Sequence, residues 1–315
     1  MPKKKDSATT VAQAPLPVRA RMRTLEKLSP RHAARVAEHY WFTVPPAPSA
    51  KRLNRFTPDG GAPFFLMSGE SEIRGESFGP EDGPLAVLVH GWGGYWQQLG
   101  AHVPALVQAG YHVVAYDAPS HGGSTHGAEG FGSGSVLEMA QAFGAVLDEL
   151  GRRPALVMAH SIGAMAVMRA QRERQAADAY VLIAPEVRLE PAIDWFSQVI
   201  GMGPRTRSLF LERVQQRVGI DLSDFDMTAD VRRTVAGAQV PALLAIHDTD
   251  DPDTPAAETR KLVEHWPGAE LMLTNSLGHR QVIWHDEVKK RVADFVARLD
   301  TTPGIHALPT DRSVG

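Results

Sequence analysis

The sequence contains no cysteine, which excludes disulfide bonds and thiolate metal sites. No apolar run approaches the ~20 residues that a helix needs to cross a bilayer. The first residues also lack the apolar stretch of a secretory signal. We therefore expect a cytoplasmic protein without stable membrane insertion, although many exported proteins also lack cysteine.

The chain has little net charge, formally −3 over 315 residues at pH 7. Such a balance argues against a nucleic-acid-binding protein. Hydrophobic residues make up 43% of the chain, which is enough for one large α/β domain, with or without a modest insertion. Nothing in the sequence indicates the oligomeric state.

Basic residues gather near the N-terminus. Through Arg35, nine Lys and Arg residues are opposed only by Asp6 and Glu26. We expect residues 1–55 to form a basic extension that is disordered over residues 1–23. Its one helix should start at Pro30, because apolar residues then recur at helical spacing until a proline-rich stretch. We expect this helix to pack on the main domain; docking on a membrane, or contact of the basic arm with an anionic surface, is the alternative.

Apolar runs and helical patterns follow one another through the rest of the chain. Fully apolar runs are typical of strands buried on both faces. We expect strands at residues 62–67, 72–78, 85–89, 111–116, 155–159, 180–184, 240–246 and 270–274, and helices that include residues 95–109, 136–150 and 281–299.

Ser161 stands between the apolar run 155–159 and a helical pattern that begins at Ile162. A serine at such a sharp turn projects its hydroxyl out of the sheet, where a histidine from another loop can activate it. The free N–H groups at the helix start favour an anionic intermediate. Gly163 suits the tight turn, and Ala159 stands where a glycine is usual. An ordinary strand–helix turn with an exposed serine is the alternative.

Glycines follow another buried strand in the motif His90-Gly91-Trp92-Gly93-Gly94. Such a loop lets the backbone approach a ligand and offer N–H groups to an oxyanion. A plain glycine turn would look the same in sequence.

Three motifs in this order resemble the α/β-hydrolase family: the glycine loop at residues 90–94, the segment from Asp117 to Ser124, and residues 159–163. The resemblance covers about residues 60–300. It implies a mostly parallel central sheet flanked by helices, with a core from residues 56–184 and 240–300 and a helical cap from residues 185–239. It also implies that the backbone N–H groups of Trp92 and Ile162 form the oxyanion hole. Residues 301–315 are expected to be a flexible tail.

The family has an acid and then a histidine after the serine. The acidic loop that follows the strand at 240–246 matches the position of the acid, with Asp251 preferred and Asp250 as its rival; Asp248 and Asp253 are weaker candidates. This loop could instead cap the next helix. A calcium loop does not fit, because no glycine stands at the required place.

The histidine of the family pattern matches His279, which follows a glycine in the loop after the last expected strand. The resemblance then implies a serine hydrolase that cleaves a carboxylic ester through Ser161, His279 and Asp251, with no metal and no organic cofactor. A thioesterase or acyltransferase would use the same residues, and haloperoxidase or perhydrolase side activity is compatible with a serine. A non-catalytic binding protein that kept the fold is the alternative from another class.

The expected partner is a small-molecule ester or thioester. We expect His90, Gly91 and His160 near the substrate pocket, with His90 ordering the glycine loop by hydrogen bonds. Aromatic and aliphatic residues in the expected cap hint at an apolar acyl or alcohol group.

Overall fold

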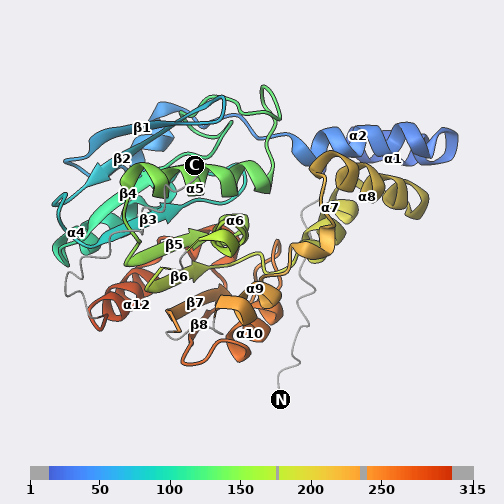
Figure 1. Ribbon diagram of the computed structural model, residues 1–315. Coiled ribbons are helices and arrows are strands. Elements are labelled where there is room, and N and C mark those ends of the chain that lie inside the picture. Colours follow the sequence, from blue (N-terminus) through green and yellow to red (C-terminus); the bar gives the residue numbers. More distant parts are fainter. Residues whose placement is uncertain (1–13, 175–176, 235–239, 300–315) are drawn as a thin grey trace, which may run out of the picture.

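The computed structural model describes residues 14–174, 177–234 and 240–299. The basic residues before position 14 and the expected tail at 301–315 lie outside this part of the chain. Within it, the strands form one eight-stranded sheet in the order β1-β2-β4-β3-β5-β6-β7-β8 (Figure 1). Strand β2 is antiparallel to β1 and β4, and the other neighbours are parallel. The predicted α/β-hydrolase-type fold is confirmed by this architecture.

Four central strands are buried along their whole length, as their apolar sequences predict: β3 (Leu85–Val89), β4 (His112–Tyr116), β5 (Leu156–His160) and β6 (Ala179–Ile183). Strand β7 (Ala242–Asp248) is nearly as buried, and β8 (Glu270–Thr274) lies at the edge. Strands β1 (Ala62–Ser68) and β2 (Ser71–Phe78) form an antiparallel hairpin at the other edge.

Alternate residues of each central strand enter two different cores, because successive side chains of a strand point to opposite faces. One core contains α5 (Val136–Leu150), α6 (Ile162–Ala170) and α10 (Ala256–Glu264). The other contains the 3₁₀-helix η2 (Trp96–His102), α4 (Val103–Gln108) and α12 (Asp286–Val296). The single helix expected at 281–299 is replaced by two helices, the short α11 (Gly278–Gln281) and then α12.

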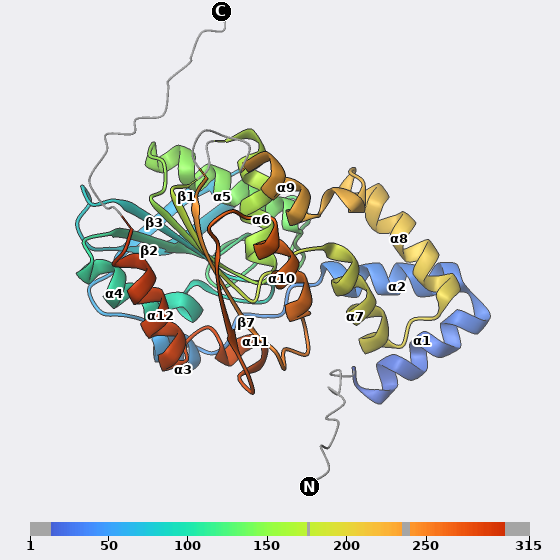
Figure 2. The same ribbon diagram turned by 90° about the horizontal axis from the view of Figure 1, so that it is seen from below.

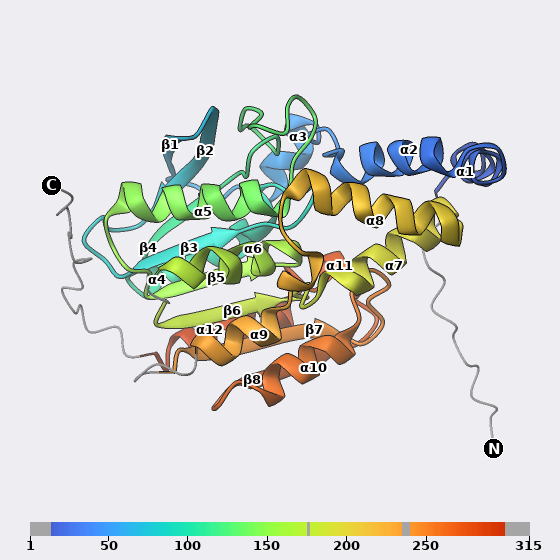
Figure 3. The ribbon, with the colours of Figure 1, turned by 45° about the vertical axis from the view of Figure 1, so that its right-hand side comes forward.

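Four helices lie together beyond one end of the sheet (Figures 2 and 3). They are α1 (Leu16–Leu28), α2 (Pro30–Phe42), α7 (Leu189–Ile200) and α8 (Pro204–Val218), and we call them the four-helix unit. Helix α2 packs on α8, and α1 packs on α2 and α7. Helix α9 (Met227–Thr234) returns to the core and packs on α6 and α10. The remaining short helices are α3 (Ala50–Leu53), η1 (Asn54–Phe56), η3 (Gln171–Glu173) and η4 (Leu222–Asp224).

The structure corrects two expectations for the N-terminal extension. Residues 16–23, expected to be disordered, belong to α1, so the extension contains more than one helix. The helix from Pro30 packs on α8 and α1 and also reaches the main domain, where the Gly134 N–H donates to the Phe42 carbonyl at 3.0 Å. Met22 is the one fully buried side chain of α1, and the apolar residues at its two ends, Leu16 and Leu28, are exposed. Its stability therefore depends on tertiary partners that a local sequence pattern does not reveal. No helix in the described ranges is long and apolar enough to cross a membrane.

Candidate active site

Ser161 occupies the turn between β5 and α6 with φ 54° and ψ −130°. A side chain other than glycine adopts this backbone conformation only when its surroundings enforce it, and such strain is common at functional sites. The surroundings are tight, since a Cβ atom added to Gly163 would collide with the His90 carbonyl oxygen. Ala159, in place of the usual glycine, is fully buried in the core beside α5 and α6, which accommodates its methyl group.

His279 lies within hydrogen-bond distance of both expected partners. Its Nε2 atom is 3.0 Å from Ser161 Oγ, and its Nδ1 atom is 2.8 Å from an Asp251 carboxylate oxygen. Ser161 follows β5, Asp251 follows β7 and His279 follows β8. The carboxyl ends of these strands lie at one edge of the parallel sheet. The arrangement is that of a nucleophile, a base and the group that orients the base.

The neighbouring carboxylates have other partners. Asp250 accepts a hydrogen bond from the Ser276 N–H at 3.0 Å and is exposed. Asp248 accepts from the Thr274 hydroxyl at 2.7 Å and the Leu277 N–H at 3.0 Å, and so ties the loop after β7 to the loop after β8. Of these candidates, Asp251 is therefore the one that the loop brings to His279.

Asp251 is held ionised by its surroundings. Burial alone would raise the pKa of this carboxyl, but hydrogen bonds from His247 and His279, the charge interaction with His279 and the Thr254 N–H outweigh it. The pKa of Asp251 therefore lies below its ordinary value. The Thr254 hydroxyl donates to Asp251 at 2.8 Å and lies 3.2 Å from His279 Nδ1.

The glycine loop after β3 is fixed by His90. The Ala118 N–H donates to His90 Nε2 at 2.9 Å, so the ring proton is on Nδ1, which donates to the Gly91 carbonyl at 2.7 Å. Burial, with the nearby His121, lowers the pKa of His90 to about 3, so the ring stays neutral. In the described part of the chain, the N–H groups of Trp92 and Ile162 have no acceptor, which leaves both available to a ligand.

A cavity of about 600 Å³ contains Ser161 and His279 in its wall. His160 lines this cavity, whereas His90 and Gly91 are not among its lining residues. The His90 ring is turned into its own loop. The His160 Nε2–H donates to the His279 carbonyl at 3.0 Å, and burial, then the proximity of His279, keeps the pKa of His160 well below its ordinary value.

The wall of the cavity changes in character from one side to the other. Near Ser161 it includes Glu186, Asp253, Thr254 and Arg280. Elsewhere it is mainly aromatic and aliphatic, with residues from the four-helix unit: Tyr40, Trp41, Phe42, Leu189, Ala192, Trp195, Phe196, Val199, Val214 and Val218.

The family model of the alpha/beta hydrolase family matches residues 86–295, more than half of the chain. The chain belongs to this alpha/beta hydrolase family. The match contains all the motifs around Ser161, Asp251 and His279, and it begins after both N-terminal helices.

Individual relatives of this alpha/beta hydrolase are similar over shorter segments. A non-heme chloroperoxidase of Burkholderia pyrrocinia is 33% identical over 107 residues, which cover 34% of this chain and 37% of that protein. Epoxide hydrolase B of Mycobacterium tuberculosis is 36% identical over 87 residues, or 27% of this chain and 23% of that protein. The chain thus spans well under half the length of these relatives.

An esterase from Rhodococcus sp. ECU1013 resembles the structure with a TM-score of 0.54 at 18% identity. The likeness covers 75% of this chain and 99% of the esterase. At this level of identity, the likeness shows the fold alone.

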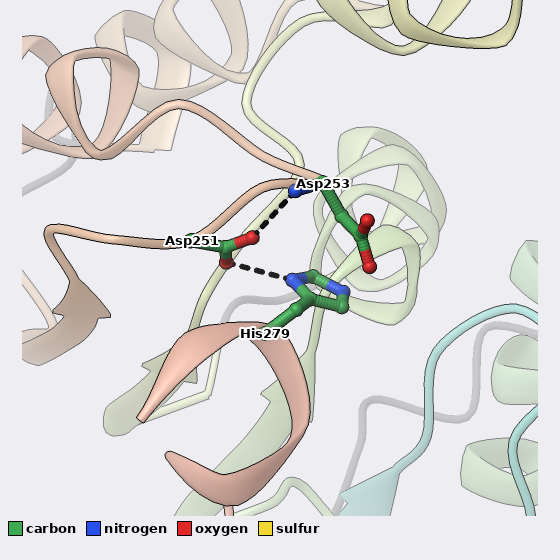
Figure 4. A group of neighbouring side chains, drawn as sticks. All are labelled: Asp251, Asp253 and His279. Atoms are coloured by element: carbon green, nitrogen blue, oxygen red, sulfur yellow. Dashed lines mark hydrogen bonds and ion pairs between the residues drawn. The ribbon is translucent and has the colours of Figure 1, made fainter. Parts of the chain in front are cut away.

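Asp251, Asp253 and His279 of this alpha/beta hydrolase form a cluster of the kind that can hold a metal ion, with one donor atom of each within 4.8 Å of the others (Figure 4). Two of the three residues already have partners, because Asp251 and His279 bond to each other and Asp251 also accepts from the Asp253 backbone N–H at 2.8 Å. A metal ion would have to displace the hydrogen bond that orients His279. The chemistry of this cluster therefore fits a base with its orienting acid better than a metal site.

Sequence reasoning did not assign a role to Thr254 or His247, which both contact Asp251. Thr254 belongs to the acidic loop after β7, and His247 lies near the end of β7 itself, but threonine and histidine at such places carry no specific signal. Glu186 was not singled out either, because a lone carboxylate after a strand looks like any surface residue.

Proposed function

We propose that this alpha/beta hydrolase is a serine hydrolase that cleaves a carboxylic ester through an acyl-enzyme. The observation that carries the proposal is the chain of contacts from Ser161 Oγ to His279 Nε2, at 3.0 Å, and from His279 Nδ1 to Asp251, at 2.8 Å. Both distances lie within the range for activating a serine hydroxyl.

In the first half of the reaction, His279 Nε2 takes the Ser161 proton as Oγ attacks the carbonyl carbon. The carbonyl oxygen becomes an oxyanion that accepts hydrogen bonds from the Trp92 and Ile162 N–H groups. Asp251 holds the proton of His279 on Nδ1 and stabilises the imidazolium. The tetrahedral intermediate expels the alcohol, which takes its proton from His279, and the acyl group stays on Ser161.

In the second half, His279 takes a proton from water as the water oxygen attacks the acyl-enzyme. A second tetrahedral intermediate forms against the same N–H groups and collapses to the free acid and Ser161. The low pKa of Asp251 supports this cycle, since the carboxylate stays ionised while His279 gains and loses its proton.

The named relatives suggest other chemistry. Epoxide hydrolase chemistry in this family uses an aspartate nucleophile, and Ser161 at the nucleophile position disfavours it. A serine is compatible with the haloperoxidase or perhydrolase activity that the chloroperoxidase relative suggests. A thioesterase or acyltransferase would use the same residues, so the identity of the acyl donor decides between them. A cytoplasmic location, which the lack of cysteine favours, is part of this proposal.

A fluorophosphonate probe tests the proposal, because it reacts only with an activated serine. We expect labelling of the wild-type protein at Ser161 and none in the folded Ser161→Ala variant. Hydrolysis of p-nitrophenyl esters and of acyl-CoA thioesters should then be compared, with esters turned over faster. A folded wild-type protein that is neither labelled nor active on any of these substrates would favour a binding protein without catalytic activity.

A further inference from the structure

The N-terminal helices are joined to the insertion by buried and charged contacts. The Trp41 ring meets Phe196 of α7 and Phe210 of α8 edge to face, with centroids 5.1 and 5.8 Å apart. Glu38 of α2 forms an ion pair with Arg213 of α8. These contacts make α1, α2, α7 and α8 one packed body, in agreement with their arrangement in Figures 2 and 3.

Glu26 of α1 also completes the start of α8. Its carboxylate accepts hydrogen bonds from the N–H groups of Arg205 at 3.2 Å and Thr206 at 3.1 Å. The first N–H groups of a helix have no partner within the helix and favour a negative charge. Helix α8 therefore depends on the N-terminal extension for its cap.

After α2 the chain crosses the glycine loop that carries Trp92. The Trp92 indole N–H donates to the Thr43 carbonyl at 3.3 Å. Pro45 covers Gly93, so that a Cβ atom on Gly93 would lie 2.9 Å from Pro45 Cγ. The Val44 N–H donates to the Gly132 carbonyl at 2.8 Å and anchors the crossing segment to the core.

The same segment forms one side of the cavity that contains Ser161. Trp41, Phe42 and Pro45 line it together with residues of α7 and α8 such as Val199 and Val214. Without α1 and α2 this apolar side of the cavity would be open. None of these N-terminal residues falls within the family match at 86–295.

We propose that residues 14–48 are a functional part of the active site. In this proposal, which rests on the proposed ester hydrolysis, α2 closes a binding site for an extended apolar chain of the ester. Trp41 supplies apolar surface against which this chain packs, and so determines specificity. Residues 43–45 are positioning residues that hold the Trp92 loop, and hence one of the two oxyanion donors.

Chain length provides the first test. Burial of each methylene group should raise kcat/KM about three- to fourfold until the cavity is filled. Two substrate series distinguish the side of the ester that enters the cavity: p-nitrophenyl alkanoates extend the acyl group, and alkyl acetates extend the alcohol. One series should rise steeply with length, and a flat response in both would overturn the assignment of an apolar chain.

The Trp41→Ala variant tests the role of α2. Relative to the wild type, kcat/KM of this variant should fall for both chain lengths, and the fall for an ester with an octyl chain should be on the order of tenfold larger than the fall for one with a two-carbon chain. Val218→Phe, on the α8 side of the cavity, should shift the preference to shorter chains without removing the aromatic contacts. Phe131→Ala is the matched control, since Phe131 is an aromatic residue that is 93% exposed, outside the cavity.

Fluorophosphonate labelling of each variant separates the possible failures. If the variants are labelled as fast as the wild type but keep its length preference, α2 has a structural role only and this inference fails alone. If the folded wild type is not labelled, the proposed hydrolase function fails first.

Trp92→Phe tests the positioning role, because it removes the indole donor to Thr43 and keeps the backbone N–H. We expect a several-fold fall in kcat with KM nearly unchanged, and slower labelling by the fluorophosphonate. Trp284→Phe is the control, since that indole stacks on Phe56 and does not line the cavity. An unchanged kcat in Trp92→Phe would contradict the positioning role.

A second observation concerns Glu186, which follows β6 and lines the cavity although it is only 6% exposed. Its N–H donates to the Ser161 carbonyl at 3.2 Å, which places the residue next to the serine. No hydrogen bond or ion pair joins its carboxyl group to any other residue in the described ranges. A buried carboxyl group without a partner is costly and indicates a partner from outside the chain.

We infer that the Glu186 carboxyl group binds a polar oxygen of the substrate next to the scissile ester and determines specificity for such substrates. Burial, then the charges of Asp251, Glu258 and Asp253, raise the pKa of Glu186 well above its ordinary value. Glu258 itself is paired with Arg188 at 2.7 Å. A protonated Glu186 can donate to a hydroxyl, ether or carbonyl oxygen.

Two matched substrates test this inference: 2-hydroxyethyl octanoate and propyl octanoate, which differ by a hydroxyl in place of a methyl group. We expect wild type and Glu186→Gln to prefer the hydroxyl ester, and Glu186→Leu to lose that preference by about tenfold through KM. The preference of the wild type should decline at alkaline pH, whereas that of Glu186→Gln should not. Equal behaviour of all three proteins on both esters would overturn the inference.

Discussion

The imidazole of His247 lies 3.3 Å from the Asp251 oxygen that also accepts from His279. His247 is fully buried, and its other nitrogen lies 2.7 Å from the Thr259 hydroxyl of α10. The carboxylate of Asp251, the proposed partner of His279, is thus also held by His247 of β7, and His247 is itself held by Thr259 of α10. Such a support limits the rotation of the carboxylate and keeps the orientation of His279 constant.

The first prediction concerns this acid. Asp251→Asn should lower kcat by about 10⁴-fold, because the amide favours the wrong tautomer of His279. Asp250→Asn is the matched control one residue away, and we expect it to keep most of the activity, since Asp250 bonds to Ser276 and not to His279. Steady-state kinetics of both variants on a p-nitrophenyl ester give the comparison. Full activity in Asp251→Asn would show that another group orients the base.

The second prediction uses the backbone strain at Ser161. At φ 54° and ψ −130°, glycine is favoured over any residue with a Cβ atom. Ser161→Gly should therefore unfold with a free energy about 1 kcal/mol higher than Ser161→Ala. Both should lose activity on the order of 10⁶-fold.

Ala145→Gly in α5 is the control for this comparison, since glycine inside a helix should lower stability by about 1 kcal/mol. Urea unfolding of the three variants measures the free energies. Equal stability of Ser161→Gly and Ser161→Ala would mean that the turn is not strained.

The sequence was sufficient to predict the core of the fold and the residues that meet in the candidate site. Ser161 follows a buried apolar run and His279 follows the loop after the last strand, and the ends of parallel strands meet at one edge of a sheet. Local pattern could therefore indicate contacts between residues far apart in the chain. The choice between Asp250 and Asp251 depended on the path of a single loop, which residue types alone do not determine.

The four-helix unit could not be predicted in the same way. Helix α1 buries only Met22 fully, and Glu26 looks like an exposed residue until the start of α8 is placed beside it. The contacts of Thr43 and Pro45 with the Trp92 loop join segments about fifty residues apart that share no motif. Such contacts arise from tertiary packing, and only the assembled chain reveals them.

A third prediction addresses the alanine that replaces the usual glycine before the serine. Ala159→Gly should keep kcat/KM within about twofold, because the turn already forms with alanine. The variant should lose roughly 1–2 kcal/mol of stability, from the removed methyl group and the greater freedom of the unfolded chain. Denaturant unfolding and ester kinetics measure the two effects. A large change in activity with little change in stability would mean that the methyl group positions Ser161.

The fourth prediction concerns pH. Burial lowers the pKa of His90 to about 3 and, for His102 and His121, to about 4. Each ring is neutral in the folded protein near pH 5, whereas in the unfolded chain it takes up a proton below about 6.5. The unfolded state then binds more protons, so the free energy of unfolding should fall as pH decreases from about 6.5 towards 4.

His102 allows this prediction to be tested at one position, because it lies away from the candidate site and bonds to the Ile283 carbonyl at 2.7 Å. Unfolding of His102→Gln should take up about one proton fewer than unfolding of the wild type. The slope of the free energy of unfolding against pH should therefore be smaller by about 1.4 kcal/mol per pH unit between pH 4.5 and 6. His126→Gln is the control, since His126 is exposed and should leave the slope unchanged. Urea unfolding across this range measures the slopes. If His102→Gln keeps the wild-type slope, protonation of His102 does not couple to unfolding, and the acid sensitivity must come from other groups.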